Sequence, residues 1–127
     1  MIIFDSNIWI AYSYDDDSLH DKARNIVENN TSHILLPEYI LCAVSTVLLQ
    51  KAGKDTALRF IDRMTNNSDI TILYSSPAFV DATIKMFSSK NDDEHLPFID
   101  TSLLYLSMSY KIISFDRHLN RAIKARQ

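Results

Sequence analysis

Glycine and cysteine are scarce in this sequence of 127 residues. Gly53 is the one glycine, where an average usage of about 7% would give roughly nine. Phosphate-binding loops and dinucleotide fingerprints need two or more glycines, which excludes a P-loop or Rossmann cofactor site. Cys42 is the one cysteine, which excludes an intrachain disulfide and a Cys-rich zinc site. This composition suits a reducing cytoplasm.

Long hydrophobic runs are also absent. The longest unbroken run, Tyr39 to Val44, has six residues, whereas a helix that spans a bilayer needs about 20. We therefore expect no membrane contact, and because Met1 to Asp5 contain no basic residue we expect no export signal. Apolar residues make up 46% and charged residues 23%, as in ordinary globular chains, so we expect one folded domain over residues 1–127.

Positive charge is limited and unevenly placed. The 13 basic and 16 acidic residues give a net charge of -3, so no global positive field indicates nucleic-acid binding. However, the last 17 residues contain five of the 13 cations: Lys111, Arg117, Arg121, Lys124 and Arg126. Two short acidic runs, at 15–17 and 92–94, are interpreted as solvated loops.

Short apolar runs predict four buried strands, at residues 2–4, 33–36, 70–74 and 111–115. Helical patterns between and after them predict helices from Ser18 as N-cap to about 29, from Pro37 to Gly53, from about 58 to 66, from Pro77, after Pro97, and from Arg117 to about Arg126. Strands that alternate with helices imply a three-layer α/β/α sandwich with a central parallel sheet. We expect the strand order 3-2-1-4, with room for a short fifth strand.

Some helical faces are also predicted. Leu58, Ile61 and Met64 recur at helical spacing, as do Val80, Ile84 and Phe87 on one face of the next helix. Cys42 is expected in the core, on the apolar face of the helix that follows Pro37.

Four acidic residues are expected at the carboxyl edge of this sheet. Asp5 ends the first strand and Asp116 follows the fourth, while Glu38 and Asp100 lie in the first turns of helices that start at the same edge. Each acid alone is ordinary as a helix cap or macrodipole partner. Together they repel, because two carboxylates about 5 Å apart cost roughly 3 kcal/mol at an effective dielectric of 20. Mg²⁺ or Mn²⁺ is the natural compensation, and such a site favours phosphodiester hydrolysis.

The segments that contain these acids resemble the PIN-domain family, including its VapC-type toxins, in motifs and in order: Phe4-Asp5-Ser6-Asn7, Pro37-Glu38, Phe98 to Leu104 and Ile113 to Leu119. The sequence departs from the family at Pro37, where Ser or Thr is frequent, and after Asp100, where small residues are common. The resemblance implies an Mg²⁺- or Mn²⁺-dependent endoribonuclease whose metal is held by Asp5, Glu38, Asp100 and Asp116. Asp5 and Asp100 are the preferred direct ligands. Glu38 and Asp116 act directly, through water, or by orienting the nucleophile.

Substrate contacts and partners are predicted with the same site. Arg117, Arg121 and Lys124 share one helix face beside Asp116 and could neutralise RNA phosphates, and Asn7 could position a water or ligand. By the resemblance, the chain is a homodimeric toxin of a type II toxin-antitoxin pair, bound by a small antitoxin protein.

Two alternatives stay open. One is a catalytically inactive PIN-like binding or scaffold module. The other is a phosphoacceptor receiver domain, which needs an aspartate at the end of the third strand where this sequence has Tyr74-Ser75-Ser76.

Overall fold

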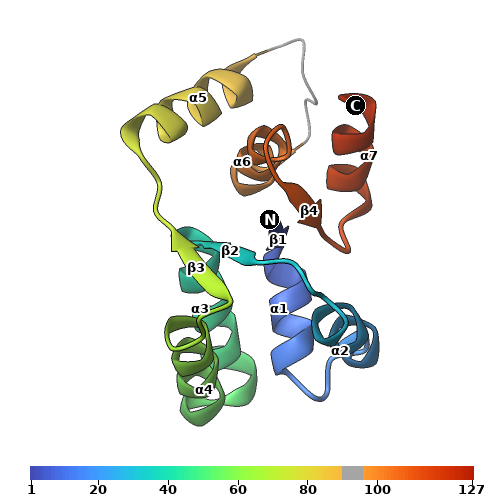
Figure 1. The fold of residues 1–127 in the computed structure, drawn as a ribbon, viewed down its shortest axis with the longest axis vertical. Helices are drawn as coiled ribbons and strands as arrows, with labels where there is room; N and C mark the ends of the chain where they lie inside the picture. Colours follow the sequence, from blue (N-terminus) through green and yellow to red (C-terminus); the bar gives the residue numbers. More distant parts are fainter. Residues whose placement is uncertain (90–95) are drawn as a thin grey trace.

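Four parallel strands form one sheet at the centre of the computed structural model, which describes residues 1–89 and 96–127 (Figure 1). The predicted strand order, β3-β2-β1-β4, is confirmed. The described residues form no fifth strand, and the acidic run at 92–94 lies outside them. The strands are β1 (Ile2–Phe4), β2 (Ile34–Pro37), β3 (Ile70–Leu73) and β4 (Lys111–Ile113).

Seven helices in the described residues make the outer layers, which confirms the three-layer α/β/α sandwich. Right-handed crossovers require the helices that connect β1 to β2 and β2 to β3 to lie on one face, and those that connect β3 to β4 to lie on the other. Accordingly, α1 packs on α2 and α3, and α3 on α4, whereas α6 packs on α5 and α7. The helices are α1 (Ser6–Ser13), α2 (His20–Glu28), α3 (Glu38–Ala52), α4 (Lys54–Thr65), α5 (Pro77–Ser88), α6 (Phe98–Leu106) and α7 (Arg117–Ala125).

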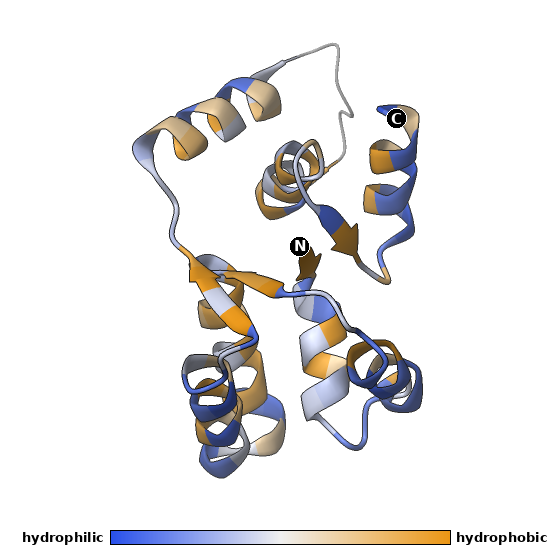
Figure 2. Ribbon diagram, viewed as in Figure 1, coloured by the Kyte–Doolittle hydropathy of each residue, from blue (hydrophilic) through white to orange (hydrophobic). Residues whose placement is uncertain are grey.

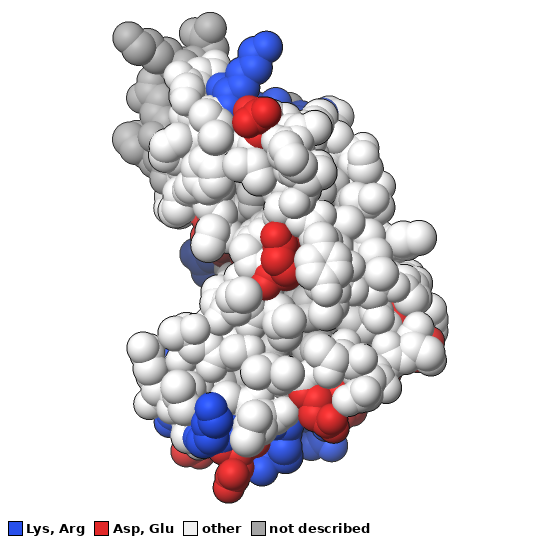
Figure 3. Space-filling view, turned by 90° about the vertical axis from the view of Figure 1, so that its left-hand side faces the viewer, with Lys and Arg blue, Asp and Glu red and all other residues white. Residues whose placement is uncertain are grey.

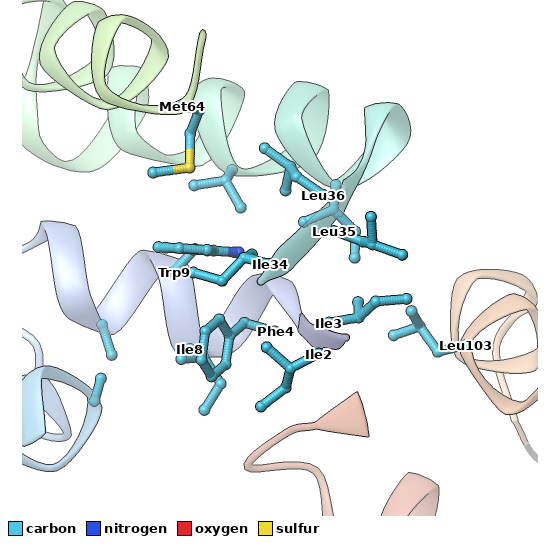
Figure 4. Close-up of a cluster of buried hydrophobic side chains, with 14 of the residues drawn as sticks. Ile2, Ile3, Phe4, Ile8, Trp9, Ile34, Leu35, Leu36, Met64 and Leu103 are labelled. Atoms are coloured by element: carbon cyan, nitrogen blue, oxygen red, sulfur yellow. The ribbon is translucent and has the colours of Figure 1, made fainter. Parts of the chain in front are cut away.

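The core lies between the two central strands and the helices that cover them (Figure 4). All residues of β1 and β2 are buried, as predicted, whereas β3 and β4 are partly exposed because they form the edges of the sheet. Trp9 is 1% exposed and packs edge-on against Phe4 and Phe60, with ring centroids 5.3 and 6.0 Å away. Its burial makes it a core residue.

Several predicted boundaries were wrong by a few residues. Helix α2 has Leu19 and not Ser18 at its N-cap, and the carboxylate of Asp17 accepts the Leu19 N–H at 2.8 Å. β2 is shifted to 34–37, and β3 and β4 end at 73 and 113 because the backbone turns there into the connections that reach α5 and α7. Proline has no backbone N–H, so Pro37 at the end of β2 leaves no hydrogen-bond donor without a partner.

Three predictions about buried faces need correction. On α4 the buried residues are Ala57, Phe60 and Met64, whereas Leu58 is 50% exposed. The five apolar residues among the twelve of this helix extend beyond its buried side, so spacing alone could not select that side. Cys42 is exposed, on the outer side of α3.

The predicted apolar face of α5 is present but not buried. Val80, Ile84 and Phe87 are 38%, 49% and 50% exposed, and Thr83 is the buried residue of this helix. α5 packs against α6 rather than across the sheet, so its opposite side is left uncovered (Figure 1). Within the described residues, no helix has the length and apolarity needed to cross a membrane.

Candidate active site

The candidate site is built where β1 and β4 end side by side. Parallel pairing places Phe4 opposite Ile113, and the backbone N–H of Asp5 donates to the Ile113 carbonyl at 2.9 Å. Asp5 therefore leaves the sheet next to the segment that leads to Asp116. The two acids, which lie at opposite ends of the sequence, reach one edge of the sheet.

Asp5 is 3% exposed, and its two carboxylate oxygens have different partners. Oδ1 accepts the Ser6 backbone N–H at 2.7 Å and so caps α1. Oδ2 accepts the Ser114 hydroxyl at 2.6 Å. Burial raises the pKa of Asp5 above its ordinary value, the hydrogen bonds from Ser114 and Ser6 oppose this shift, and the charge of Asp116 adds to it.

Ser114, which the sequence analysis missed, joins these groups. Its Oγ donates to Asp5 and accepts from the Asp116 backbone N–H at 3.0 Å and from Asn7 Nδ2 at 3.1 Å, which uses the full capacity of a hydroxyl. Asn7 Oδ1 accepts the Phe115 N–H at 3.1 Å. Asn7 thus braces segment 114–116 against the start of α1, and its predicted contact with a ligand or water stays a prediction.

Asp100 and Asp116 complete a group of three acids. Asp116 caps α7 by accepting the backbone N–H groups of His118 and Leu119 at 2.9 and 3.2 Å. The pKa of Asp100 is raised to about 6. Burial is the largest cause, and the negative charges of Asp116 and Asp5 and a hydrogen bond with Asp116 raise the pKa further. The start of α6 therefore holds Asp100 against the other two acids.

Glu38 lies at the same edge, after β2, but is held separately. Its Oε1 accepts the Ser75 backbone N–H at 3.1 Å and its Oε2 accepts the Ser75 hydroxyl at 3.0 Å. Glu38 and Asp5 both lie close enough to Tyr39 for their charges to act on its hydroxyl. The pKa of Tyr39 is raised to about 12, by burial first and then by the charges of Glu38 and Asp5.

Asp5, Asp100 and Asp116 form a negative region. No cation of the described residues contributes to the pKa shifts of Asp5 or Asp100. Carboxylate oxygens are the donors that Mg²⁺ and Mn²⁺ prefer, so the chemistry of this set suits a divalent cation. In the part of the chain that the structure describes, no three acidic, histidine or cysteine side chains already stand in a ligating arrangement.

Helix α7 adds exposed basic side chains beside the acids. Arg117, Arg121 and Lys124 are exposed, whereas Leu119 and Ala122 on the opposite side are buried. Figure 2 shows this division of α7 into a hydrophilic and a hydrophobic side.

Lys22 of α2 is a further cation near the site that the sequence did not indicate. Its Nζ lies 5.4 Å from the centre of the Phe115 ring, next to Asp116 in sequence. Only the folded chain brings it there, because Lys22 is far from residue 115 in the sequence.

Comparisons with known proteins agree with this architecture. The profile of the PIN domain family matches residues 2–125. A similar solved structure is the Mycobacterium tuberculosis VapC20, described as a sarcin-ricin loop cleaving toxin, with a TM-score of 0.84 and 16% sequence identity over 96% of this chain and 95% of that chain. No curated protein matches the sequence.

Proposed function

Because this chain belongs to the PIN domain family, we propose that it is an endoribonuclease that hydrolyses RNA phosphodiester bonds with Mg²⁺ or Mn²⁺. The observation that carries this proposal is the meeting of Asp5, Asp100 and Asp116, where burial and the neighbouring carboxylates raise the pKa of Asp5 and Asp100. VapC20, which shares the fold, is described as a sarcin-ricin loop cleaving toxin, and this supports RNA as the substrate. Residues 1–127 act as a single nuclease domain in this proposal.

Asp5 and Asp100 are the proposed direct metal ligands, and Glu38 and Asp116 act directly, through water, or by orienting the attacking water. When bound, the metal lowers the pKa of a water molecule and neutralises charge that develops on the scissile phosphate. The chain fixes the orientation of these acids. The Ser114 hydroxyl holds Asp5 at 2.6 Å, and two hydrogen bonds from Ser75 hold Glu38.

RNA binding is assigned to the exposed side of α7. Arg117, Arg121 and Lys124 lie on the helix that Asp116 caps, so phosphates bound there are adjacent to the acids. Each neutralised phosphate releases counterions, and affinity for RNA should therefore fall as the salt concentration rises.

The proposed biological role is that of the toxin of a type II toxin-antitoxin pair in the cytoplasm, with a small antitoxin protein as partner. A homodimer is proposed on the exposed apolar side of α5, where Val80, Ile84 and Phe87 continue to Phe98 of α6 through the contact of the Phe87 and Phe98 rings at 5.4 Å. Figure 3 shows that uncharged surface dominates this side of the molecule. A two-fold axis through such a face would bury it in both copies.

The test is incubation of the purified protein with total RNA in Mg²⁺ or Mn²⁺ and in EDTA. We expect cleavage only with metal, and we expect Asp100→Asn to lower the rate by at least about 100-fold because one carboxylate ligand is lost. The control is Asp81→Asn, which removes an exposed carboxylate from α5 and should leave cleavage unchanged. Cleavage that persists in EDTA would refute metal dependence. Intact RNA under all conditions would favour the inactive binding module.

A further inference from the structure

A small cavity of about 130 Å³ lies next to the proposed active site. It is partly open to solvent and is bordered by the ends of β2 and β3, the first turns of α3 and α5, and the last turn of α6 with the residues after it. It lies apart from the acidic group, and neither the proposed metal nor the phosphate contacts on α7 use it. Its most informative lining residues are Tyr39, Tyr74, Ser75, Phe79, Leu106 and Tyr110.

Four of the nine residues that line this cavity are aromatic, and none is charged. The rings of Tyr39 and Phe79 are nearly parallel, at an angle of 13° with centroids 6.4 Å apart. Tyr39 is fixed by a hydrogen bond of 2.6 Å between its hydroxyl and Ser102 Oγ, and Phe79 packs edge-on against Tyr105 at 5.9 Å. The aromatic walls are therefore in place before any ligand arrives.

The size of the cavity limits what can enter. A closed apolar cavity of about 150 Å³ accepts a benzene ring, so the volume of about 130 Å³ in this partly open cavity takes in about one six-membered ring. The sugar and phosphate of a nucleotide would have to stay outside. Among the bases of RNA, a pyrimidine can enter whole, whereas a purine would leave one of its two rings outside.

Ser75 connects the cavity to the proposed catalytic group. Its side chain lines the cavity, and its N–H and hydroxyl hold the Glu38 carboxylate at 3.1 and 3.0 Å. Tyr39, the residue after Glu38, forms another part of the wall. If an RNA base occupied the cavity, the RNA backbone attached to that base would therefore pass close to the candidate acids.

We propose that this aromatic cavity receives one pyrimidine base of the RNA substrate. Proteins recognise single-stranded RNA by stacking unpaired bases on aromatic side chains, and an aromatic cavity beside a phosphodiester-cleaving site provides such a place. The inference rests on the proposed function for the identity of the ligand. It assigns to Tyr39, Tyr74 and Phe79 the role of selecting which nucleotide lies near the cleaved bond.

The test measures binding of uridine and adenosine to the protein in EDTA, by NMR chemical shifts of the backbone amides. We expect uridine, at millimolar concentrations, to shift the signals of Ser75, Phe79 and Tyr110, and adenosine to bind at least about fivefold more weakly. Tyr74→Ala should weaken uridine binding at least about fivefold, because one stacking contact is removed. Tyr74 is 73% exposed, so this change should leave the fold intact.

A second variant fills the cavity. Leu106→Phe should abolish the uridine shifts, whereas Leu49→Phe, the same change at an exposed position on α3, should preserve them. Uridine shifts confined to other surfaces, or equal binding of adenosine, would overturn the proposal. A change of oligomeric state in Leu106→Phe but not in Leu49→Phe would also overturn it, because the cavity would then hold a side chain of a second copy.

The metal-free measurement separates this inference from the proposed function. RNA cleavage without uridine binding refutes the base cavity alone. Uridine binding without cleavage leaves the cavity supported as a base-binding site and refutes the nuclease proposal.

Discussion

Replacing Asp100 by asparagine tests the acidic group without any assumption about its substrate. The pKa of Asp100 is raised from 3.8 to about 6 in the folded protein. Each tenfold change in an acid constant is worth about 1.4 kcal/mol, so holding the ionised form in the folded chain costs at most about 3 kcal/mol. Screening by solvent at this partly exposed carboxylate lowers the figure to about 1–2 kcal/mol.

The sign follows from proton binding. Between pH 3.8 and about 6 the folded chain binds more protons at Asp100 than the unfolded chain does, so the stability of the unmutated protein falls as the pH rises through this window. The amide that replaces the carboxylate in Asp100→Asn cannot ionise. This variant should therefore be more stable than the unmutated protein by about 1–2 kcal/mol above pH 7, and the difference should vanish below pH 4.

Urea denaturation in EDTA at pH 4, 5, 6 and 7.5 measures this difference. The control Asp81→Asn removes a charge that lies four residues before Lys85 on α5, and it should lower stability by no more than about 0.5 kcal/mol. The reasoning fails if Asp100→Asn is less stable than the unmutated chain at pH 7.5, or if its advantage does not depend on pH. Either result would mean that burial and the charges of Asp116 and Asp5 do not disfavour the ionised form of Asp100.

Three further predictions concern the metal, the Asp5 carboxylate and the α5 face. Millimolar Mg²⁺ or Mn²⁺ should raise the melting temperature, and less so at pH 5 than at pH 7.5 because protons compete at Asp100; no shift at pH 7.5 would contradict the metal site. Ser114→Ala should destabilise the protein by about 1–3 kcal/mol in urea denaturation, since a buried Asp5 oxygen loses its donor, whereas Ser114→Thr, which keeps the hydroxyl, should cost less. Ile84→Asp should convert a dimer to a monomer in analytical ultracentrifugation, and an unchanged mass would refute α5 as the interface.

The sequence predicted the sheet and the edge where the acids meet, because both follow from short-range patterns. A buried strand is a run of apolar residues, and parallel strands end at one edge, so Asp5 and Asp116 could be placed together without coordinates. The strand order 3-2-1-4 then made their two strands neighbours.

The details of the site could not be predicted in the same way. Ser75 meets Glu38 across 37 residues and Ser114 meets Asp5 across 109, and a single serine gives no periodic signal. Helices α4 and α5 show a second limit. Their apolar residues cover more than the buried side, so the pattern could not distinguish a core residue such as Phe60 from an exposed one such as Ile84.

The pairing of β1 with β4 has a consequence for synthesis. A ribosome makes the chain from its N-terminus, so Asp5 emerges early, but it has no partner strand on one side until Lys111–Ile113 has been translated. Every shorter nascent chain lacks Ser114 and Asp116 and cannot assemble the acidic group. Under the proposed function, a nascent chain that ends before residue 114 would lack activity while it is still attached to the ribosome.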